Sequence, residues 1–256
     1  MTVAVGIDVG GTKIAAGLVD VERGEVVRWE RTATRPERGG AAVLADCAEL
    51  AGRLGGEGVA VGVGICEVVD RSGELTTAET VEWRDLDVPA AFGGAPVTVD
   101  SDVRAAALAE ARFGAGRGLG SFLHVIVGTG AALCLVLDGR PHLGEHGNAI
   151  ILGAPPVEQV AGGATLGERV HDAGARTEAA AAIGRVVAVL VNALDPAAVV
   201  VGGGLGASAG FADGIAAALR PAIWCEATRG LPVVPTALGE AGGVLGAALA
   251  ALEARA

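Results

Sequence analysis

The sequence predicts an α/β protein with two lobes that face a cleft. Short apolar segments typical of strands alternate with longer segments typical of helices, and the alternation occurs in two successive blocks. Glycine-rich turns follow several of the apolar segments. We expect an N-terminal lobe at 1–113, completed by a C-terminal helix at about 240–256, and a C-terminal lobe at 114–239.

Strand-like segments dominate the first block. Two apolar strands are expected at Val3–Ile7 and Ile14–Val19, and a third strand at Val26–Thr32. A helix is expected at Ala41–Leu54, followed by the wholly apolar strand Val59–Ile65, a pattern typical of strands buried on both faces. After an irregular stretch, the block ends with a short strand at Val97–Val99 and an alanine-rich helix that ends at Phe113.

The second block repeats this pattern. Two apolar strands are expected at Phe122–Val127 and Ala132–Leu137, and two further strands at Ala198–Val201 and Pro232–Pro235. Three helices are expected at Thr177–Leu194, Phe211–Leu219 and Ala241–Glu253. The uncharged run Gly118–Leu137 is long enough to span a bilayer, but its central glycines favour two strands around a turn.

Composition limits the classes of function. The chain has 256 residues, of which 51% are hydrophobic and 19% charged, so it is expected to fold rather than remain disordered. A net charge of −11 disfavours nucleic acid and anionic membranes as partners. The four cysteines, Cys47, Cys66, Cys134 and Cys225, form no C-x-x-C pair, and no secretory leader is recognisable, which predicts reduced thiols and a cytoplasmic location.

Three motifs match well-known patterns but lack a required partner. The segment Gly202–Ala207 matches a dinucleotide fingerprint but has no acid at the next strand end. The segment Gly206–Gly210 matches a hydrolase elbow, yet the last histidine of the chain, His171, precedes it. His142–His146 matches a metalloprotease pattern, but nearby proline and glycines disfavour the helix that it needs, so these histidines are expected to be solvated or to face substrate.

The N-terminal glycine turn, Gly10-Gly11-Thr12, is the first candidate for phosphate binding. It lies between two apolar strands and leaves backbone N–H groups and a hydroxyl free to face phosphate oxygens. Asp8 precedes the turn and could hold a hydrated magnesium ion, and Lys13, the only lysine, follows it. Taken alone, the same residues are also compatible with an ordinary glycine-rich hairpin.

Two further turns resemble the first. The G-T-G turn, Gly128-Thr129-Gly130, also joins two apolar strands, and the triple-glycine turn, Gly202-Gly203-Gly204, ends a third. One such turn is weak evidence, but three in this order indicate a phosphate-binding protein.

At this point the sequence resembles the ROK group of repressors, open reading frames and kinases. The group's motif D-x-G-G-T-K is found at Asp8–Lys13, its G-T-G turn at Gly128–Gly130, and its L-D-G at Leu137–Gly139. Its L-D-P-x-x-V-x-V-G-G-G is found at Leu194–Gly204. The resemblance extends over essentially the whole chain.

The resemblance implies a sugar kinase with the actin/hexokinase-like (ribonuclease H-like) fold. Two lobes would close over ATP and a sugar, with the glycine turns on the phosphates, the triple-glycine turn near adenosine, and Mg²⁺ held with the nucleotide at Asp8. Polyphosphate remains open as an alternative donor. Homodimers are frequent in the group, so a homodimer is expected.

The resemblance also places the catalytic base. The group's V-x-V-E-N-D-A-N-A-A-A-L-A-E segment is similar to Val97–Glu110, which puts the base at Asp102. Asp102 would accept the proton of a sugar hydroxyl as its oxygen attacks the γ-phosphorus. The alternative is a helix N-cap, although Asp100 or Ser101 could supply that cap instead.

The group's sugar-binding residues are largely replaced. The asparagine before the base is Ser101, and the G-E-I-G-H segment reads Ile150–Ala154, so that only the later glutamate, Glu158, remains. The group's zinc loop is also missing between Ala154 and Glu158, so structural zinc is expected to be absent. Loss of two hydrogen bonds to charged groups would weaken glucose binding by about 3 to 6 kcal/mol.

Two hypotheses follow from these replacements. In the first, the chain phosphorylates another polyol, such as an aminosugar or a cyclitol, that contacts some of Cys66, Glu67, Ser101, Asp102, Glu145, His146 and Glu158. In the second, the chain keeps the fold but is catalytically silent and binds a sugar or a protein partner. For Cys66, a role as a small core residue remains the alternative to substrate contact.

Overall fold

The computed structural model describes residues 2–55, 58–152 and 173–254. The chain forms two compact units. The first contains Met1–Phe113, Leu143–Ala149 and Glu240–Ala256, and the second contains Gly114–His142 and Ile150–Gly239. Residues 143–149, which we expected in the C-terminal lobe, therefore belong to the first unit, and that part of the expected boundary was wrong.

The first unit is built on a mixed sheet with the strand order β3-β2-β1-β4-β5. Its strands are β1 (Val3–Val9), β2 (Lys13–Asp20), β3 (Glu25–Ala33), β4 (Ala60–Ile65) and β5 (Val97–Ser101). The β1-β2 and β2-β3 pairs are antiparallel, whereas β1, β4 and β5 run parallel. The carboxyl ends of three parallel strands therefore meet at one edge of the sheet.

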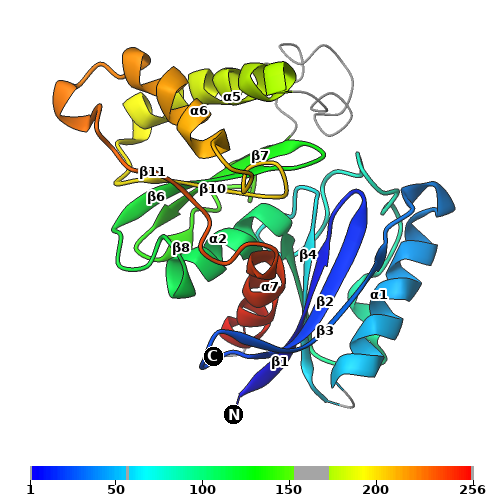
Figure 1. The fold of residues 1–256 in the computed structure, drawn as a ribbon. Coiled ribbons are helices and arrows are strands. Elements are labelled where there is room, and N and C mark those ends of the chain that lie inside the picture. Colours follow the sequence, from blue (N-terminus) through cyan, green and yellow to red (C-terminus); the bar gives the residue numbers. More distant parts are fainter. Residues whose placement is uncertain (1, 56–57, 153–172, 255–256) are drawn as a thin grey trace. The chain divides into compact units, whose positions relative to one another are not determined.

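Helices cover both faces of this sheet (Figure 1). Helix α1 (Gly40–Gly55) packs on one face, where Val43 and Leu50 share a core with Ile7. Helix α7 (Ala241–Glu253) packs on the other face, and α2 (Asp102–Phe113) packs against α7. The chain approaches α7 closely at Gly62, because a Cβ there would lie 1.8 Å from the Ala247 carbonyl oxygen.

The second unit contains a six-stranded sheet with the order β11-β10-β6-β7-β8, and β9 pairs with β7. Its strands are β6 (Ser121–Val127), β7 (Ala131–Leu137), β8 (Arg140–Pro141), β9 (Ile150–Leu152), β10 (Val199–Gly202) and β11 (Val233–Pro235). Helices α5 (Ala173–Leu194) and α6 (Phe211–Leu219) pack on it, and both contribute to one apolar core with β6 and β10. The two expected strands around the G-T-G turn are thereby confirmed.

Short 3-10 helices complete the described chain, at η1 (Pro36–Arg38), η2 (Pro89–Phe92), η3 (Arg220–Ala222) and η4 (Glu226–Thr228). Among the described residues, one helix, Gly174–Leu194, is long and apolar enough to cross a membrane by length and composition. Its residues Ile183, Val187 and Val191 belong to the core of the second unit, as expected for a helix that packs on its own sheet.

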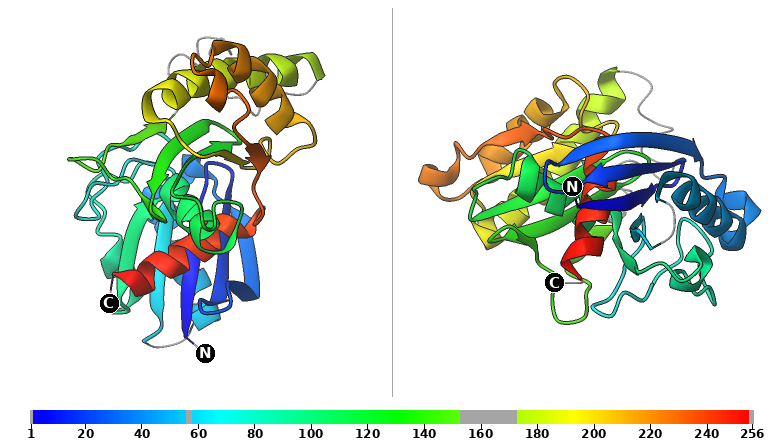
Figure 2. Two further views of the ribbon diagram at one scale, coloured as in Figure 1. Left: turned by 90° about the vertical axis from the view of Figure 1, so that its left-hand side faces the viewer. Right: turned by 90° about the horizontal axis from the view of Figure 1, so that it is seen from below.

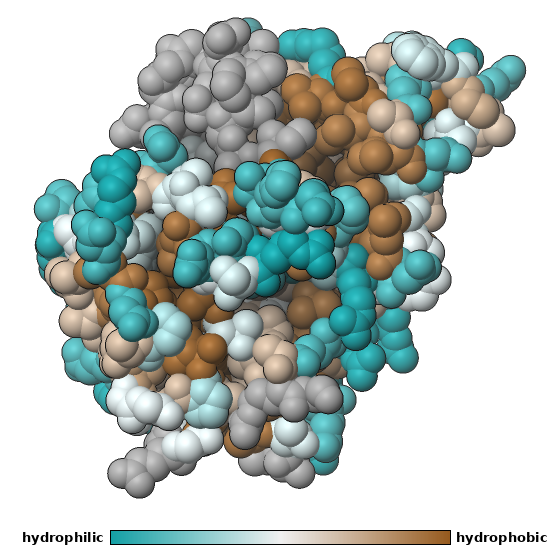
Figure 3. Space-filling view, turned by 180° about the vertical axis from the view of Figure 1, so that it is seen from behind, coloured by the Kyte–Doolittle hydropathy of each residue, from teal (hydrophilic) through white to brown (hydrophobic). Residues whose placement is uncertain are grey.

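Large apolar side chains are exposed on the second unit. Trp224 is 84% exposed, and Val189 and Leu194 of α5 are 67% and 42% exposed. The view from behind shows apolar atoms gathered over α5 and α6 (Figure 3), and the two further views of the ribbon show the same helices from other sides (Figure 2).

Candidate functional site

Carboxylates gather at the edge where the parallel strands of the first unit end. The sheet register places Asp8 of β1 beside Gly64 of β4, and Gly64 beside Asp100 of β5. A glycine lies between the two acids, and a Cβ at that glycine would lie 3.4 Å from the Cα of Asp102. The missing side chain therefore leaves room for Asp102 directly after β5.

Asp102 is the first residue of α2 and is half-buried. Burial raises the pKa of its carboxyl from 3.8 to about 8, and the negative charges of Asp8, Glu67 and Asp100 add to the rise. Its Oδ1 accepts a hydrogen bond from the Val103 N–H, 2.6 Å away, which opposes the rise. A carboxylate with this elevated pKa is a strong proton acceptor once it is ionised.

Asp8 lies at the end of β1 and is also half-buried. Burial raises the pKa of its carboxyl to about 6, and the positive charge of Lys13 partly offsets the rise. The carboxylate packs against the first turn of α7, where a Cβ at Gly243 would lie 2.5 Å from its Oδ2. A glycine at this position of α7 thus makes space for an acid that is in electrostatic contact with Asp102.

The N-terminal glycine turn is fastened to the strand that follows it. The Gly10 N–H donates to the Lys13 carbonyl at 3.0 Å, and the Thr34 hydroxyl donates to the Gly10 carbonyl at 2.6 Å. Thr12 and Lys13 are exposed, and the Lys13 ammonium pairs with Glu240 at 2.9 Å. The turn is therefore held in place while its tip remains accessible.

Glu67 does not have the substrate-facing position that we expected. Its side chain is 1% exposed, and its oxygens accept hydrogen bonds from the Thr77 hydroxyl at 2.6 Å and from the N–H groups of Glu79 at 3.0 Å and Thr80 at 2.7 Å. In this structure the buried carboxylate anchors the loop at 77–81. The negative charge of this carboxylate also raises the pKa of Asp102.

Cys66 lies beside the candidate base and is half-buried. Burial raises the pKa of its thiol, and the charge of Asp102 raises it further. The thiol is therefore neutral at physiological pH and a poor nucleophile. Ser101 is fully buried, and its hydroxyl has no hydrogen-bond partner among the described atoms.

Glu145 and His146 lie on the segment Leu143–Ala149, and both side chains are exposed. The segment is not helical, which confirms that His142–His146 lacks the geometry of a metalloprotease helix. Glu158, the remaining candidate for substrate contact, lies outside the described residues.

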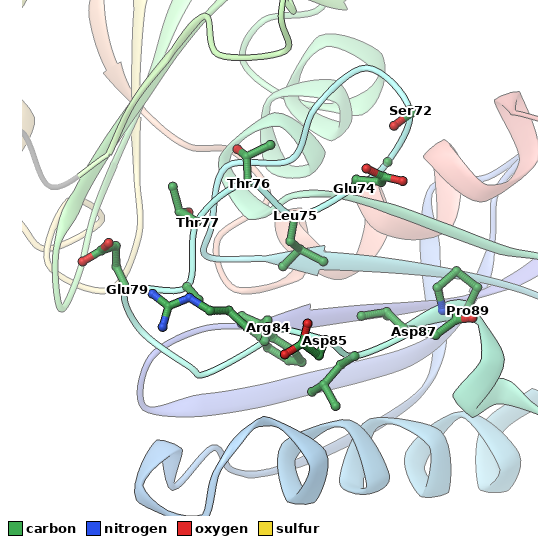
Figure 4. A pocket seen from close by; sticks show the side chains of 15 residues that line it. Ser72, Glu74, Leu75, Thr76, Thr77, Glu79, Arg84, Asp85, Asp87 and Pro89 are labelled. Carbon is green, nitrogen blue, oxygen red and sulfur yellow. The ribbon is translucent and has the colours of Figure 1, made fainter.

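A groove of about 600 Å³ lies in the first unit, lined by residues 72–79 and 83–89 (Figure 4). Thr77 and Glu79, which bind the Glu67 carboxylate, form part of its wall. None of the candidate site residues lines this groove, so its position gives no support to the site.

The other two turns lie at one edge of the second unit's sheet, because β10 pairs in parallel with β6. The Gly128 N–H donates to the Gly130 carbonyl at 2.8 Å and closes the G-T-G turn. The triple-glycine turn is fastened beside it, since the N–H groups of Leu205 and Gly206 both donate to the Val127 carbonyl at 3.0 Å. Gly203 has φ +82°, and a Cβ there would lie 2.4 Å from that carbonyl oxygen, so this position requires glycine.

The residues of the first unit are better suited to hold Mg²⁺ together with phosphates than to hold a metal by protein ligands alone. No group of three or more His, Cys, Asp or Glu that could hold a metal is found among the residues described. Mg²⁺ commonly binds through one or two carboxylates together with phosphates and water. Asp8, a half-buried carboxylate beside the N-terminal glycine turn, is suited to that role when it is ionised. The expected absence of zinc stays a prediction.

Two residues that matter for the geometry were not among the candidate site residues. Thr34 follows β3 and binds the N-terminal glycine turn, and no local signal marks it. Arg104 is 1% exposed and pairs with Asp100 at 2.6 Å. The sequence left Arg104 open between a solvated or ion-paired side chain and contact with a substrate or phosphate. The structure shows the ion pair, and the spacing of four residues from Asp100 to Arg104 was a signal for it.

The strand order and packing define the class of the protein, which is an α/β protein with the actin/hexokinase-like fold. A solved structure with this fold, a ROK family glucokinase from Streptomyces griseus in complex with glucose and AMPPNP, has a TM-score of 0.80 and 26% identity, covering 98% of this chain and 99% of that one. The model of the ROK family matches residues 4–169 and 164–254, so the chain belongs to the ROK family.

Curated relatives support the same assignment. A glucokinase of Streptomyces coelicolor is 36% identical over 160 residues, which cover 60% of this chain and 49% of that protein. The match therefore spans about half the length of this relative. A polyphosphate glucokinase of Mycobacterium tuberculosis is 30% identical over 259 residues, covering 96% of this chain and 90% of that protein.

Proposed function

We propose that the chain transfers the γ-phosphoryl group of ATP to a hydroxyl of a hexose-like acceptor. The observation that carries this proposal is the Asp102 carboxylate, which begins α2 at the carboxyl edge of the parallel strands and has a pKa raised to about 8. The similarity to glucokinases supports a sugar as acceptor.

Asp102 acts as the general base. It accepts the proton of the acceptor hydroxyl while that oxygen attacks the γ-phosphorus, and the bond from phosphorus to the β,γ-bridging oxygen breaks to release ADP. The backbone N–H groups and hydroxyls of the three turns, Gly10-Gly11-Thr12, Gly128-Thr129-Gly130 and Gly202-Gly203-Gly204, hold the nucleotide. When bound, Mg²⁺ neutralises charge on the phosphates, and Asp8 would hold it.

The acceptor is an aminosugar or a cyclitol rather than plain glucose. Four carboxylates, those of Asp8, Glu67, Asp100 and Asp102, interact at the end of the first unit's sheet. An acceptor that carries an ammonium group would gain from the negative charge of those carboxylates that are ionised. The replacement of the family's sugar-binding asparagine by Ser101, whose buried hydroxyl has no partner among the described atoms, also favours an altered acceptor.

A panel assay tests the activity. The whole chain is incubated with ATP and Mg²⁺ and with glucose, mannose, glucosamine, N-acetylated hexosamines, inositols or aminocyclitols, and ADP release is measured. Polyphosphate replaces ATP in a parallel series, because one relative is a polyphosphate glucokinase. We expect turnover with an amino-substituted or cyclitol acceptor above turnover with glucose. If no acceptor gives ADP above the background of Asp102→Asn, the proposal fails.

One observation favours the second candidate function, a catalytically silent sugar- or partner-binding protein. The Asp102 carboxylate accepts a hydrogen bond from the N–H of the next residue in α2, Val103, and so also serves the helix start. In that case acceptor binding, measured by calorimetry, would be tight and unchanged in Asp102→Asn, and no phosphate would be transferred.

We propose in addition that the chain forms a homodimer through the exposed apolar surface of the second unit. The backbone at Trp224 is held there, because the Asn192 side-chain oxygen accepts a hydrogen bond from the backbone N–H of Trp224 at 3.0 Å and the Asn192 side-chain nitrogen donates one to the Ala222 carbonyl at 2.9 Å. Light scattering should give the mass of a dimer for the native chain and that of a monomer for Trp224→Arg. A monomeric native chain would contradict this proposal. The cytoplasmic location stays a prediction.

A further inference from the structure

Arg104 is a buried cation whose donors reach three separate segments of the first unit. Its Nε donates to Asp100 Oδ1 at 2.6 Å, its Nη1 donates to the Gly147 carbonyl at 2.7 Å, and its Nη2 donates to the Val69 carbonyl. The residue is 1% exposed. A planar guanidinium with fixed donor directions is suited to hold several acceptors in one geometry.

Each of these acceptors lies next to a candidate site residue. Asp100 precedes Ser101 and Asp102, and Val69 follows Cys66 and Glu67. Gly147 directly follows Glu145 and His146, on the segment Leu143–Ala149.

The segment Leu143–Ala149 packs closely against the rest of the first unit at Gly147. This glycine is buried and has φ +76°, and a Cβ there would lie 2.5 Å from the Cα of Asp70. A second arginine, Arg71, donates to the Gly144 carbonyl at 2.9 Å, but Arg71 is exposed. Because hydrogen bonds from a buried charge contribute more than those from an exposed one, Arg104 carries most of the attachment.

We infer that Arg104 is a positioning residue that holds the segment Leu143–Ala149, with Glu145 and His146, in a fixed place relative to Asp102. The expected effect on kinetics rests on the proposed function. The attachment of the segment to Arg104 does not depend on that function. The resemblance places asparagine at this position, and a shorter amide carries fewer donors than the guanidinium. The attachment is therefore a feature of this chain, and it sets the geometry in which the acceptor meets the base.

Hydrogen exchange and kinetics of Arg104→Met test the inference on the full chain. We expect exchange of the amides in residues 143–149 to accelerate by at least about tenfold, the equivalent of losing a hydrogen bond to a charged group. We expect kcat/KM for the acceptor to fall on the order of 10²-fold, because misplacement by about 1 Å has such effects, while KM for ATP stays unchanged. Arg112→Met, at an exposed arginine near the end of the same helix, is the matched control and should change neither readout.

Two further variants keep the test decisive if Arg104→Met does not fold. Arg104→Lys keeps the charge beside Asp100 but cannot reach all three acceptors, so it should restore folding and only part of the exchange protection. Gly147→Ala disturbs the packing of Gly147 against Asp70 and leaves Arg104 unchanged. This variant should raise KM for the acceptor.

The failures of the two proposals are distinguishable. Unchanged exchange of residues 143–149 in the variants that fold would overturn the inference, even if the native chain is an active kinase. A native chain that phosphorylates no acceptor would overturn the proposed function, and the exchange measurement would still decide whether Arg104 holds the segment. A rise in KM for ATP as large as the rise in KM for the acceptor would show a general structural defect and would also overturn the inference.

Discussion

The glycine turns of the two units are built alike but have different surroundings. In the first unit, the N-terminal glycine turn follows Asp8, whose carboxyl interacts with that of Asp102. In the second unit, the G-T-G and triple-glycine turns contain no ionisable residue, and the residues that follow the triple-glycine turn donate hydrogen bonds to the Val127 carbonyl at the end of β6.

This difference separates two tasks. A turn without ionisable side chains can donate N–H hydrogen bonds to phosphate oxygens without repelling their negative charge. A carboxylate cluster repels phosphate unless a cation is present, but it can remove a proton from an alcohol and attract an ammonium group. Under the proposed function, the first unit would therefore carry the proton chemistry, and the second unit would contribute backbone donors for the nucleotide. The predictions below test this separation.

The largest effect is expected for Asp102→Asn. The substitution removes the proton acceptor and keeps the shape of the side chain, so kcat should fall by about 10² to 10⁴ with little change in KM for ATP. Initial rates with the best acceptor measure this. The matched control is Asp213→Asn, an exposed acid in the first turn of α6, which should keep native kcat. A kcat in Asp102→Asn close to that of the native chain would show that the first unit does not carry the proton chemistry.

The next effect is expected for Gly203→Ala in the second unit. The added Cβ would meet the Val127 carbonyl at 2.4 Å in a backbone with φ +82°, so the triple-glycine turn must shift. Strain of about 1 to 3 kcal/mol corresponds to roughly 5- to 150-fold weaker nucleotide binding, and calorimetry measures it. The acceptor affinity should not change. Gly230→Ala, where a Cβ meets nothing within 4 Å, is the control; equal losses in both variants would contradict the assignment.

The pH dependence sharpens the assignment of Asp102. Its raised pKa of about 8 means that the base is protonated at neutral pH in the free protein, so kcat/KM should rise with pH up to about 8. If kcat/KM is the same at all pH values between about 6 and about 9, the assignment is contradicted.

Stability should change in the opposite direction. Because the folded-state pKa of Asp102 is raised above 3.8, the folded protein holds a proton that the unfolded chain releases, and stability falls as pH rises through this window toward 8. The loss is at most about 1.4 kcal/mol per pH unit. The asparagine of Asp102→Asn cannot ionise. The Tm of this variant minus the Tm of the native chain should therefore be larger at about pH 8 than at about pH 5, and calorimetry measures both. A constant difference in Tm would contradict the raised pKa.

The smallest effect is expected for Glu240→Gln. The Lys13–Glu240 pair joins the end of the N-terminal glycine turn to the residue before α7, but the two side chains are 46% and 61% exposed. An exposed pair contributes about 0 to 1 kcal/mol, and salt screens it. Denaturant titration at low and high salt should therefore show a small loss that vanishes at high salt. A loss that persists at high salt would mean that Glu240 has a further role.

Much of the fold could be predicted from the sequence because its elements have strong local signals. Helices α6 and α7 have the expected bounds, Phe211–Leu219 and Ala241–Glu253. The wholly apolar strand at 59–65 is β4, which is buried along its entire length. Glycines and alternating apolar residues mark these elements without any knowledge of tertiary contacts.

The parts that could not be predicted depend on contacts between distant residues. Glu67 looked available to a substrate, but loop residues ten or more positions away occupy its carboxylate. The segment Leu143–Ala149 packs with the first unit because Arg104 and Asp70, far away in the sequence, provide its seat. Such contacts leave no periodic or local pattern in the sequence.

A structure of the chain with an aminosugar or cyclitol acceptor and a non-hydrolysable ATP analogue tests the central claim most directly. The account predicts an acceptor hydroxyl within hydrogen-bond distance of the Asp102 carboxylate, and phosphate oxygens on the backbone N–H groups of Gly128-Thr129-Gly130. An acceptor bound away from Asp102, or phosphates bound away from the glycine turns, would contradict it.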